Sequence, residues 1–239
     1  MKLWSITHRG AVREQNQDAC RFAPVSDISA LVAVCDGMGG ALSGDVASRM
    51  AIDLFFDTFL ASIPEDPIPV RLESAASVAN AAVYKRASTD ERCTGMGTTL
   101  VAALVQSGAA WIINEGDSRA YHISHNAITQ ITKDHSVVAD LLAGGNLTAE
   151  EAKNYPYRNL ITRALGAEDQ LRADFYQIPF VAGEYLLLCS DGLSNILTNE
   201  EIHHQIIFGG MDDQCCERLL ELALARGARD NVTVLLVAF

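Results

Sequence analysis

The chain has 239 residues, of which 49% are hydrophobic, so it can bury a sizeable core and is not expected to be disordered. Lysine and arginine together number 18 against 30 aspartates and glutamates, which gives a formal net charge of −12. This acidic balance argues against nucleic acid or an anionic membrane as the main partner.

The six cysteines form no Cys-x-x-Cys pair, which leaves a zinc or thioredoxin-like site without support. Cys35 and Cys189 lie inside apolar runs, and we expect them to be buried free thiols in a reducing compartment. The N-terminus lacks the apolar core of a signal peptide, and no run approaches the roughly 18 apolar residues that a membrane helix needs. We therefore expect a soluble, cytoplasmic protein with no membrane partner.

Apolar periodicity predicts two helices in the first half of the chain, over about 44–61 and about 70–87. The proline-rich stretch Pro64–Pro69 between them is predicted to be a loop. Both apolar stripes are expected to face a sheet. Their members are Ala47, Met50, Ala51, Leu54, Phe55 and Phe59 in the first helix, and Leu72, Ala75, Ala76, Ala79 and Val83 in the second.

The second half of the chain begins with a strand predicted over 99–105, followed by strands on either side of Asp117. A short helix is expected over 136–143, and capping-box patterns at Thr148–Glu151 and Thr198–Glu201 predict the start of two more. The last helix is predicted over 212–226. Strands clustered towards both ends of the chain, with two long helices between them, favour α+β layers over a βαβ array.

Four aspartates stand beside short apolar runs of the kind that form buried strands. Asp36 and Asp191 each follow such a run and precede a glycine, Asp117 closely follows a third run, and Asp230 precedes a fourth. Clustered carboxylates repel one another, and a divalent cation removes that conflict. Oxygen ligands with retained water point to Mg²⁺ or Mn²⁺ rather than zinc. The pattern therefore predicts one acidic metal site that could activate water for in-line attack on phosphorus.

The order and wording of these and further motifs resemble the metal-dependent protein phosphatases of the protein phosphatase 2C type, in particular its compact bacterial members. The resemblance covers essentially the whole chain. Its matching stretches are Arg13–Asp18, Asp36–Gly40, Gly44–Ser48, Gly95–Thr99, Gly116–Tyr121, Asp134–Ser136, Arg158–Gly166, Ser190–Leu193 and Asp230–Thr233.

This resemblance implies a four-layer α-β-β-α sandwich, in which two antiparallel sheets are flanked by helix pairs and the metals lie at one end. It implies a single catalytic domain over 1–239. The segment over about 144–167, which lacks strand character, would be a mobile flap beside the site and a place for substrate selection.

The resemblance also implies the metal ligands. Asp36 would bridge two metals, and Gly37 would donate its carbonyl oxygen. Asp191 and Asp230 would complete the first metal, and Asp117 with Asp191 would hold a third.

Two more residues take implied roles, and three positions depart from the family pattern. Asp18 would act near the second metal, directly or through water, and Arg13 would clamp the substrate phosphate. Gln17 stands where some members have a glutamate ligand, and Asn154-Tyr155-Pro156 stands where a His-Pro is usual in the flap. Met38 replaces the histidine proposed as general acid in many eukaryotic relatives, so the leaving oxygen is expected to take its proton from metal-bound water.

The activity implied is that of a metal-dependent protein serine/threonine phosphatase. A metal-bridging hydroxide would attack phosphoserine or phosphothreonine without a covalent phosphoenzyme. The implied counterpart is a serine/threonine protein kinase, and a monomer is expected. The alternative is a pseudophosphatase that binds phosphoproteins without hydrolysis, against which the intact aspartates argue. An aspartyl-phosphate enzyme would need a D-x-D pair, which neither Asp-Gly motif provides.

Overall fold

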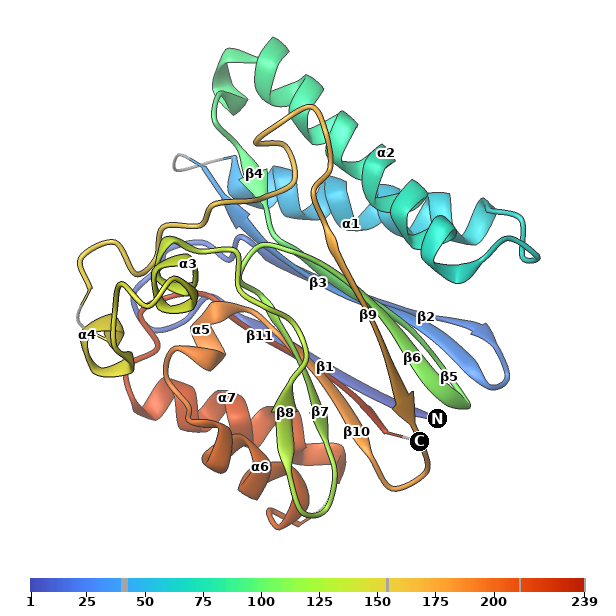
Figure 1. Ribbon diagram of the computed structural model, residues 1–239, viewed down its shortest axis with the longest axis vertical. Coiled ribbons are helices and arrows are strands. Elements are labelled where there is room, and N and C mark those ends of the chain that lie inside the picture. The colour runs from blue at the N-terminus through green and yellow to red at the C-terminus, as the bar shows by residue number, and fades with distance from the viewer. Residues whose placement is uncertain (40–42, 154, 211, 239) are drawn as a thin grey trace.

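Two antiparallel β-sheets lie face to face at the centre of the molecule, and helices cover the outer face of each (Figure 1). The computed structural model describes residues 1–39, 43–153, 155–210 and 212–238. Gly40 and Asn154, which were named above, lie outside these ranges. The arrangement confirms the four-layer α-β-β-α sandwich.

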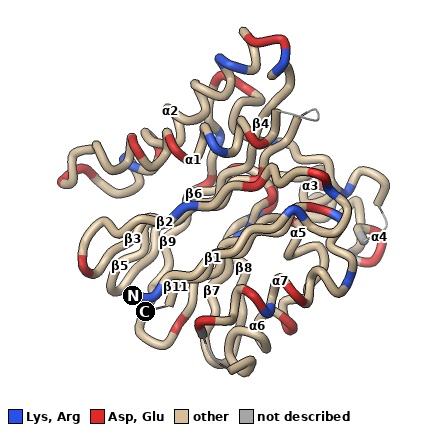
Figure 2. Tube along the Cα trace, turned by 180° about the vertical axis from the view of Figure 1, so that it is seen from behind, with Lys and Arg blue, Asp and Glu red and all other residues tan. Residues whose placement is uncertain are grey.

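The first sheet has the strand order β1-β11-β10-β7-β8, with antiparallel neighbours throughout. Its strands are β1 (Lys2–His8), β11 (Val232–Ala238), β10 (Tyr185–Cys189), β7 (Arg119–Ile123) and β8 (Ile128–Gln130). Because β1 pairs with β11, the two chain termini lie together at one end of the sandwich (Figure 2).

The second sheet has the order β2-β3-β5-β6-β9, and the short β4 pairs with the end of β3. Its strands are β2 (Asp18–Ser26), β3 (Ser29–Met38), β4 (Gly97–Thr98), β5 (Leu100–Gln106), β6 (Gly108–Glu115) and β9 (Asp174–Phe180). The strand predicted over 99–105 is β5. The edge strand β9 was not predicted; it contains Pro179, which an edge strand tolerates because one side of it makes no ladder hydrogen bonds.

The helices fall into two layers and a small group beside them (Figure 1). The second sheet is covered by α1 (Gly44–Ala61) and α2 (Ile68–Thr89), and the first by α5 (Asp191–Ser194), α6 (Asn199–Ile207) and α7 (Cys215–Ala225). The short helices α3 (Val137–Ala143) and α4 (Ala149–Lys153) lie in and beside the segment 144–167, and two 3-10 turns occur at Glu91–Cys93 and Asp212–Gln214. None of the helices in the described ranges combines the length and apolarity needed to cross a lipid bilayer.

Two helix boundaries differ from those predicted. The helix α2 begins at Ile68, so Pro69 belongs to its first turn rather than to the preceding loop. Proline is tolerated there because the first N–H groups of a helix have no partner within it. The predicted start of the last helix at 212 is a 3-10 turn, and α7 begins at Cys215. The predicted stripe of α2 is fully buried, whereas Met50 and Leu54 of α1 are only partly buried.

The central strands are buried on both faces. In β3, Val32 and Val34 pack between the sheets, whereas the alternate residues Leu31, Ala33 and Cys35 pack under α1 and α2. The strand β10 is divided in the same way, with Leu186 and Leu188 between the sheets and Leu187 and Cys189 facing α6 and α7. This two-sided burial explains why both strands are continuous apolar runs, and it holds the aspartates that follow them at the end of the sandwich.

The capping box at Thr198 gives a stability prediction. The Glu201 N–H donates to Thr198 Oγ1 at 3.3 Å, and the Thr198 N–H donates to Glu201 Oε2 at 2.9 Å. Because Ile202 and Ile206 anchor α6 in the core, Thr198→Ala should lower the free energy of unfolding by about 1 kcal/mol. Urea denaturation measures the change.

A matched control is Thr148→Ala, which removes the same kind of cap, between the exposed residues Thr148 and Glu151, from the five-residue helix α4. This helix can fray without exposing the core, so the control should lower the free energy of unfolding by less than half as much. Equal losses in the two variants would contradict the dependence on core packing.

Candidate metal centre

A cavity of about 250 Å³ opens beside the end of β3 and the segment that precedes β11, at the opposite end of β11 from the C-terminus. Segments from the whole length of the chain line it. The lining residues are Arg13, Gln17, Asp36, Gly37, Met38, Gly39, Thr99, Asp117, Asn159, Ile161, Asp191, Asp230 and Asn231. Six of the seven residues to which a role was assigned from the sequence therefore meet in one place.

Four carboxylates reach this cavity from both sheets. Asp36 lies near the end of β3, and Asp191 begins α5 directly after β10 in the other sheet. Asp117 occupies the turn where the chain crosses from β6 to β7, and Asp230 precedes β11. No two of them are neighbours in sequence, so only the stacking of the two sheets brings them together.

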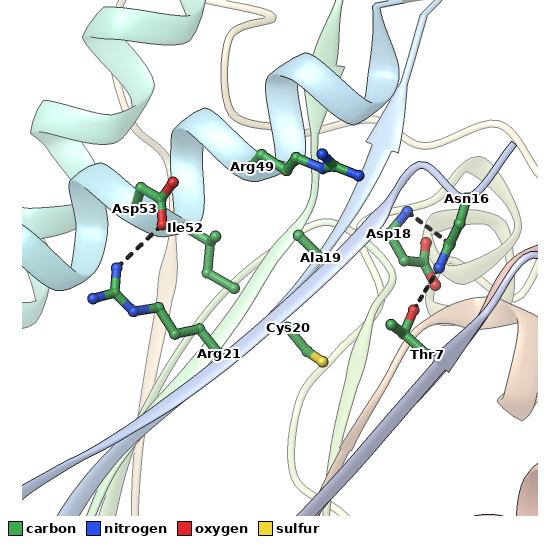
Figure 3. A pocket seen from close by; sticks show the side chains of 9 residues that line it. All are labelled: Thr7, Asn16, Asp18, Ala19, Cys20, Arg21, Arg49, Ile52 and Asp53. Carbon is green, nitrogen blue, oxygen red and sulfur yellow. Dashed lines mark hydrogen bonds and ion pairs between the residues drawn. The ribbon is translucent and has the colours of Figure 1, made fainter.

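The seventh residue, Asp18, lies behind this cavity rather than in its wall. It pairs with Asp36 across β2 and β3, and it lines a neighbouring cavity of about 350 Å³ (Figure 3). Its Oδ2 accepts hydrogen bonds from Ser190 Oγ at 2.8 Å and Thr233 Oγ1 at 2.7 Å. Its buried Oδ1 has no hydrogen-bond partner among the described residues.

Burial and mutual repulsion raise the pKa values of these carboxyl groups. The pKa of Asp36 lies well above its usual range because of burial and then the charge of Asp18. Burial and the charge of Asp191 raise the pKa of Asp117 to about 7, and burial and the charge of Asp230 raise that of Asp191 to about 6. Burial raises the pKa of Asp18 to about 7, although its two hydroxyl partners oppose the shift. The group as a whole therefore favours either protons or a cation.

The donor set fits a hard divalent cation. It consists of carboxylate and carbonyl oxygens, together with the unpartnered Oδ1 of Asp18. Within the described ranges, no three histidine, cysteine, aspartate or glutamate side chains form a closed set that could hold a metal ion by themselves. Mg²⁺ and similar ions do not need such a set, because they retain several waters and bind through one or two carboxylates.

Hydrogen bonds from Thr98 and Thr99 fix the backbone of Asp36. The Thr99 N–H and Thr98 Oγ1 both donate to the Asp36 carbonyl at 2.9 Å, and the Asp36 N–H donates to Thr99 Oγ1 at 2.9 Å. Thr99 Oγ1 also lies 2.7 Å from the hydroxyl of Ser118, the residue after Asp117. Thr99 thus links two of the carboxylate-bearing segments, a role the sequence analysis did not assign.

Gly37 occupies a position that only glycine can fill. A Cβ atom there would lie 2.0 Å from the carbonyl oxygen of Gly44 and 2.6 Å from that of Gln17. The start of α1 and the segment before β2 therefore pack directly on the backbone of β3 beside Asp36.

Two arginines near the carboxylates differ in their availability to a ligand. Arg13 lines the cavity with its side chain 54% exposed, and its Nη2 donates to Asp230 Oδ2 at 2.8 Å. Arg119 is held by Asp134, to which its Nε donates at 2.9 Å and its Nη2 at 2.7 Å. The charge of Arg119 lowers the pKa of Asp117, partly opposing the effect of burial. No role for Arg119 was predicted from the sequence.

His135 has a structural role. It is buried, its Nδ1 accepts a hydrogen bond from the Gly116 N–H at 3.1 Å, and its Nε2 lies 3.2 Å from Asp174 Oδ2. Since Nδ1 accepts, Nε2 carries the proton and donates it to Asp174. Asn159 and Ile161 line the cavity from the segment 144–167, but no role was assigned to them individually.

Relief of repulsion gives the first prediction for this site. Asp191→Asn removes one carboxylate with little change in shape, so the metal-free variant should melt at a higher temperature than the metal-free parent, by about 2–4 °C for each kcal/mol relieved. Mn²⁺ should raise the melting temperature of the parent far more than that of the variant. Thermal melts with Mn²⁺ and with chelator measure both effects. The control is Asp57→Asn, on the outer face of α1, which should change neither the metal-free melting temperature nor its rise with Mn²⁺. If metal-free Asp191→Asn is no more stable than the metal-free parent, the proposed repulsion is contradicted.

The pH dependence of stability is the second prediction. The folded pKa values of about 6 to 7 for Asp18, Asp117 and Asp191 exceed the unfolded value of roughly 3.9, so the folded state binds more protons between those limits. The metal-free protein should therefore lose stability as the pH rises from about 4 through about 7. Saturating Mn²⁺ should offset this loss, since metal binding favours ionised carboxylates. Urea unfolding across this range, with and without Mn²⁺, tests the prediction, and a flat metal-free profile would refute it.

Comparisons with known proteins agree with the geometry. Residues 7–218 match the family model for protein phosphatase 2C. The serine/threonine phosphatase Stp of Listeria welshimeri is 37% identical over 234 residues, which are 97% of this chain and 93% of that protein. The solved structure of the serine/threonine phosphatase Stp1 from Staphylococcus aureus has a TM-score of 0.94 at 35% identity, covering 100% of this chain and 94% of that one.

A further solved structure bears on the metal. The catalytic domain of the serine/threonine protein phosphatase PstP, in complex with two manganese ions, has a TM-score of 0.86 at 34% identity and covers 98% of this chain and 96% of that one. These relatives are all named as phosphatases, so they give no support to the alternative of a non-hydrolysing binding protein. The chain belongs to the protein phosphatase 2C family, alongside its compact bacterial serine/threonine phosphatases, as the ordered motifs predicted.

Proposed function

We propose that this protein hydrolyses phosphoserine and phosphothreonine side chains of proteins, with Mn²⁺ or Mg²⁺ as its cofactor. The observation that carries the proposal is the convergence of Asp36, Asp117, Asp191 and Asp230 on one cavity that also contains Arg13. The activity named for its relatives supports the substrate class, and the two manganese ions in the PstP structure support the metal.

The metal ligands proposed here are those that the family resemblance implies, and their shared place at the cavity supports them. Asp36, Gly37, Asp191 and Asp230 would hold the first ions, and Asp117 with Asp191 would hold a third. Asp18 would act on this group from behind Asp36, directly or through water. When bound, a divalent cation supplies positive charge that makes water a better nucleophile at neutral pH and offsets the charge of the phosphoryl group.

Arg13 is the residue best placed to receive the phosphoryl group. Its guanidinium lies at the cavity beside Asp230 and is more than half exposed, so a substrate can reach it from solvent. A guanidinium can donate two parallel hydrogen bonds to two phosphate oxygens, which fixes the orientation of the group as well as its position. Arg119 cannot serve in this way, because Asp134 already occupies its guanidinium.

Hydrolysis requires that a water oxygen bonds to phosphorus while the bond from phosphorus to the serine or threonine oxygen breaks. The leaving oxygen gains one proton, and the phosphate product keeps the other. The cavity-lining residues in the described part of the chain include no cysteine, histidine or serine, and Met38 has no ionisable proton. The Thr99 hydroxyl is engaged with the Asp36 N–H and Ser118, and neither Asp-Gly motif has the D-x-D pair of an aspartyl-phosphate enzyme. We therefore propose direct attack by water, with the proton for the leaving oxygen drawn from water in the cavity.

The cellular setting is part of the proposal. The counterpart would be a serine/threonine protein kinase whose targets this enzyme resets. We propose a monomer, because residues of a single chain line the cavity. We propose the cytoplasm as its location, because none of the six cysteines, all of which lie in the described ranges, forms a disulfide bond, and thiols persist in reducing compartments.

Phosphate release from a phosphothreonine peptide tests the proposed function. Turnover should require Mn²⁺ or Mg²⁺ and should disappear with chelator. Asp36→Asn should lower it more than about a hundredfold, since the loss of an outer-shell partner alone costs 10- to 100-fold in many metal enzymes. Asp57→Asn is the control and should keep parental turnover. Near-parental turnover by Asp36→Asn would show the site to be wrong, and peptide binding without release under any metal would favour the pseudophosphatase.

A further inference from the structure

The side chain of Asn231 ties together the loop that carries Arg13. This loop, residues 9–17, joins β1 to β2 and contains turns but no helix or strand. Asn231 Nδ2 donates to the carbonyl oxygens of Arg9 at 3.0 Å and Gln15 at 2.9 Å, and its Oδ1 accepts from the Gln17 N–H at 2.8 Å. The residue is only 4% exposed. One amide therefore contacts the loop at three points that bracket Arg13.

The start of the loop is also folded onto the segment before β11. The Ala11 N–H donates to the Ala228 carbonyl at 2.8 Å. Gly10 has φ +77°, and a Cβ atom there would lie 2.1 Å from the Asp230 carbonyl oxygen. Arg13 itself, in contrast, is exposed and makes its ion pair with Asp230. The position of its guanidinium over the cavity thus depends on how the rest of the loop is held.

We propose that Asn231 is a positioning residue that places the Arg13 guanidinium where the substrate phosphoryl group binds. The inference rests on the proposed function, because it takes Arg13 to contact the phosphate. Only an amide presents two donors and one acceptor in a single plane, so aspartate could not replace it although it has the same shape. Without the amide, two carbonyls and one N–H of the loop lose their partner, the loop opens more often, and the arginine spends less time in the binding position.

The Asn231 main chain keeps this effect separate from the metal ligands. The Asn231 N–H donates to Asp230 Oδ1 at 2.9 Å, and a side-chain substitution retains that bond. A variant of Asn231 should therefore weaken phosphate binding more than it weakens binding of Mn²⁺.

The chain contains a matched control in Asn80 of α2. Its Nδ2 donates to the carbonyl oxygens of Glu168 at 3.1 Å and Asp169 at 3.2 Å, and its Oδ1 accepts from the Gly166 N–H at 2.7 Å. It is only 1% exposed, and residues 166–169, which it holds, include none of the cavity-lining residues, although Asn159 and Ile161 lie earlier in the segment that ends with Gly166 and Ala167. Asn80→Ala and Asn231→Ala therefore remove the same kinds of hydrogen bond at similar burial, but only one of them acts on the Arg13 loop.

The experiment compares the full-length parent, Asn231→Ala, Asn80→Ala and Arg13→Ala in saturating Mn²⁺. Asn231→Ala should raise the KM for a phosphothreonine peptide and the dissociation constant for inorganic phosphate by about tenfold, as expected for loss of a charge-assisted hydrogen bond. Its kcat and its affinity for Mn²⁺ should change less than about twofold, which corresponds to loss of substrate binding alone. Asn80→Ala should leave all four quantities within that range. The inference would be overturned if the two asparagine variants bound phosphate equally well. It would also be overturned if Asn231→Ala lost as much affinity for Mn²⁺ as for phosphate.

Two further measurements separate this inference from the proposed function. If Arg13→Ala leaves phosphate binding unchanged, the assignment of Arg13 is wrong and the inference fails with it; if only Arg13→Ala weakens binding, the inference alone is wrong. The double variant Arg13→Ala/Asn231→Ala should bind phosphate no more weakly than Arg13→Ala, and additive losses would show that Asn231 acts independently. Calorimetric titration with phosphate gives these results even if the parent shows no turnover.

Hydrogen exchange reports on the loop itself. The amides of residues 9–17 should exchange faster in Asn231→Ala than in the parent and should be unchanged in Asn80→Ala. Unchanged exchange in Asn231→Ala would overturn the inference. If Asn231→Ala does not fold, Asn231→Ser takes its place and should show the same changes in phosphate binding and amide exchange, but smaller ones. A serine variant with parental phosphate binding and parental exchange would equally overturn the inference.

Discussion

The repulsion between carboxylates held at one end of the β-sandwich is the interaction on which the rest of this structure depends. Asp36, Asp117 and Asp191 lie near enough to one another and to Asp18 and Asp230 that neighbouring charges add to the effect of burial on their pKa values. Such a group is unfavourable as an assembly of five partly buried anions, and it becomes favourable when a divalent cation binds. The protein therefore keeps, at some expense in stability, a site whose electrostatics a metal ion would complete.

The scaffold must hold these carboxylates against their tendency to separate. Two-sided burial of β3 and β10 makes their ends rigid, because a shift of either strand would disturb both the layer between the sheets and a helical layer. Polar contacts complete the restraint, including the hydroxyl of Thr99 between Asp36 and Ser118 and the two hydroxyls on Asp18. Since the carboxylates belong to both sheets, the site forms only when the whole sandwich has formed.

Positive charge near the site is divided between two arginines with different surroundings. Arg119 is partly buried and bound to Asp134, so its charge acts on Asp117 at a fixed distance and is not available to a ligand. Arg13 is exposed and lies on a loop whose backbone is held by Asn231. The first arrangement tunes the carboxylates, and the second leaves a guanidinium free to exchange its partner for a phosphoryl group. This division also explains how a chain of net charge −12 can present a cation to an anionic substrate.

The sequence by itself determined the helices α1 and α2, the strand β5, both capping boxes, the family, and the aspartates that meet at the cavity. These features depend on periodicity along one segment or on short motifs, which local sequence encodes directly. The separate place of Asp18 behind the cavity, the edge strand β9, the link through Thr99, and the contacts of Arg119 and Asn231 were decided only by the tertiary structure. The physical reason is the sequence separation of the partners. The hydrogen bonds of Asn231 join residues 214 to 222 positions apart, and their geometry exists only once the two sheets have packed. Motifs predicted which residue types take part, but the packing of distant segments decided which atoms meet.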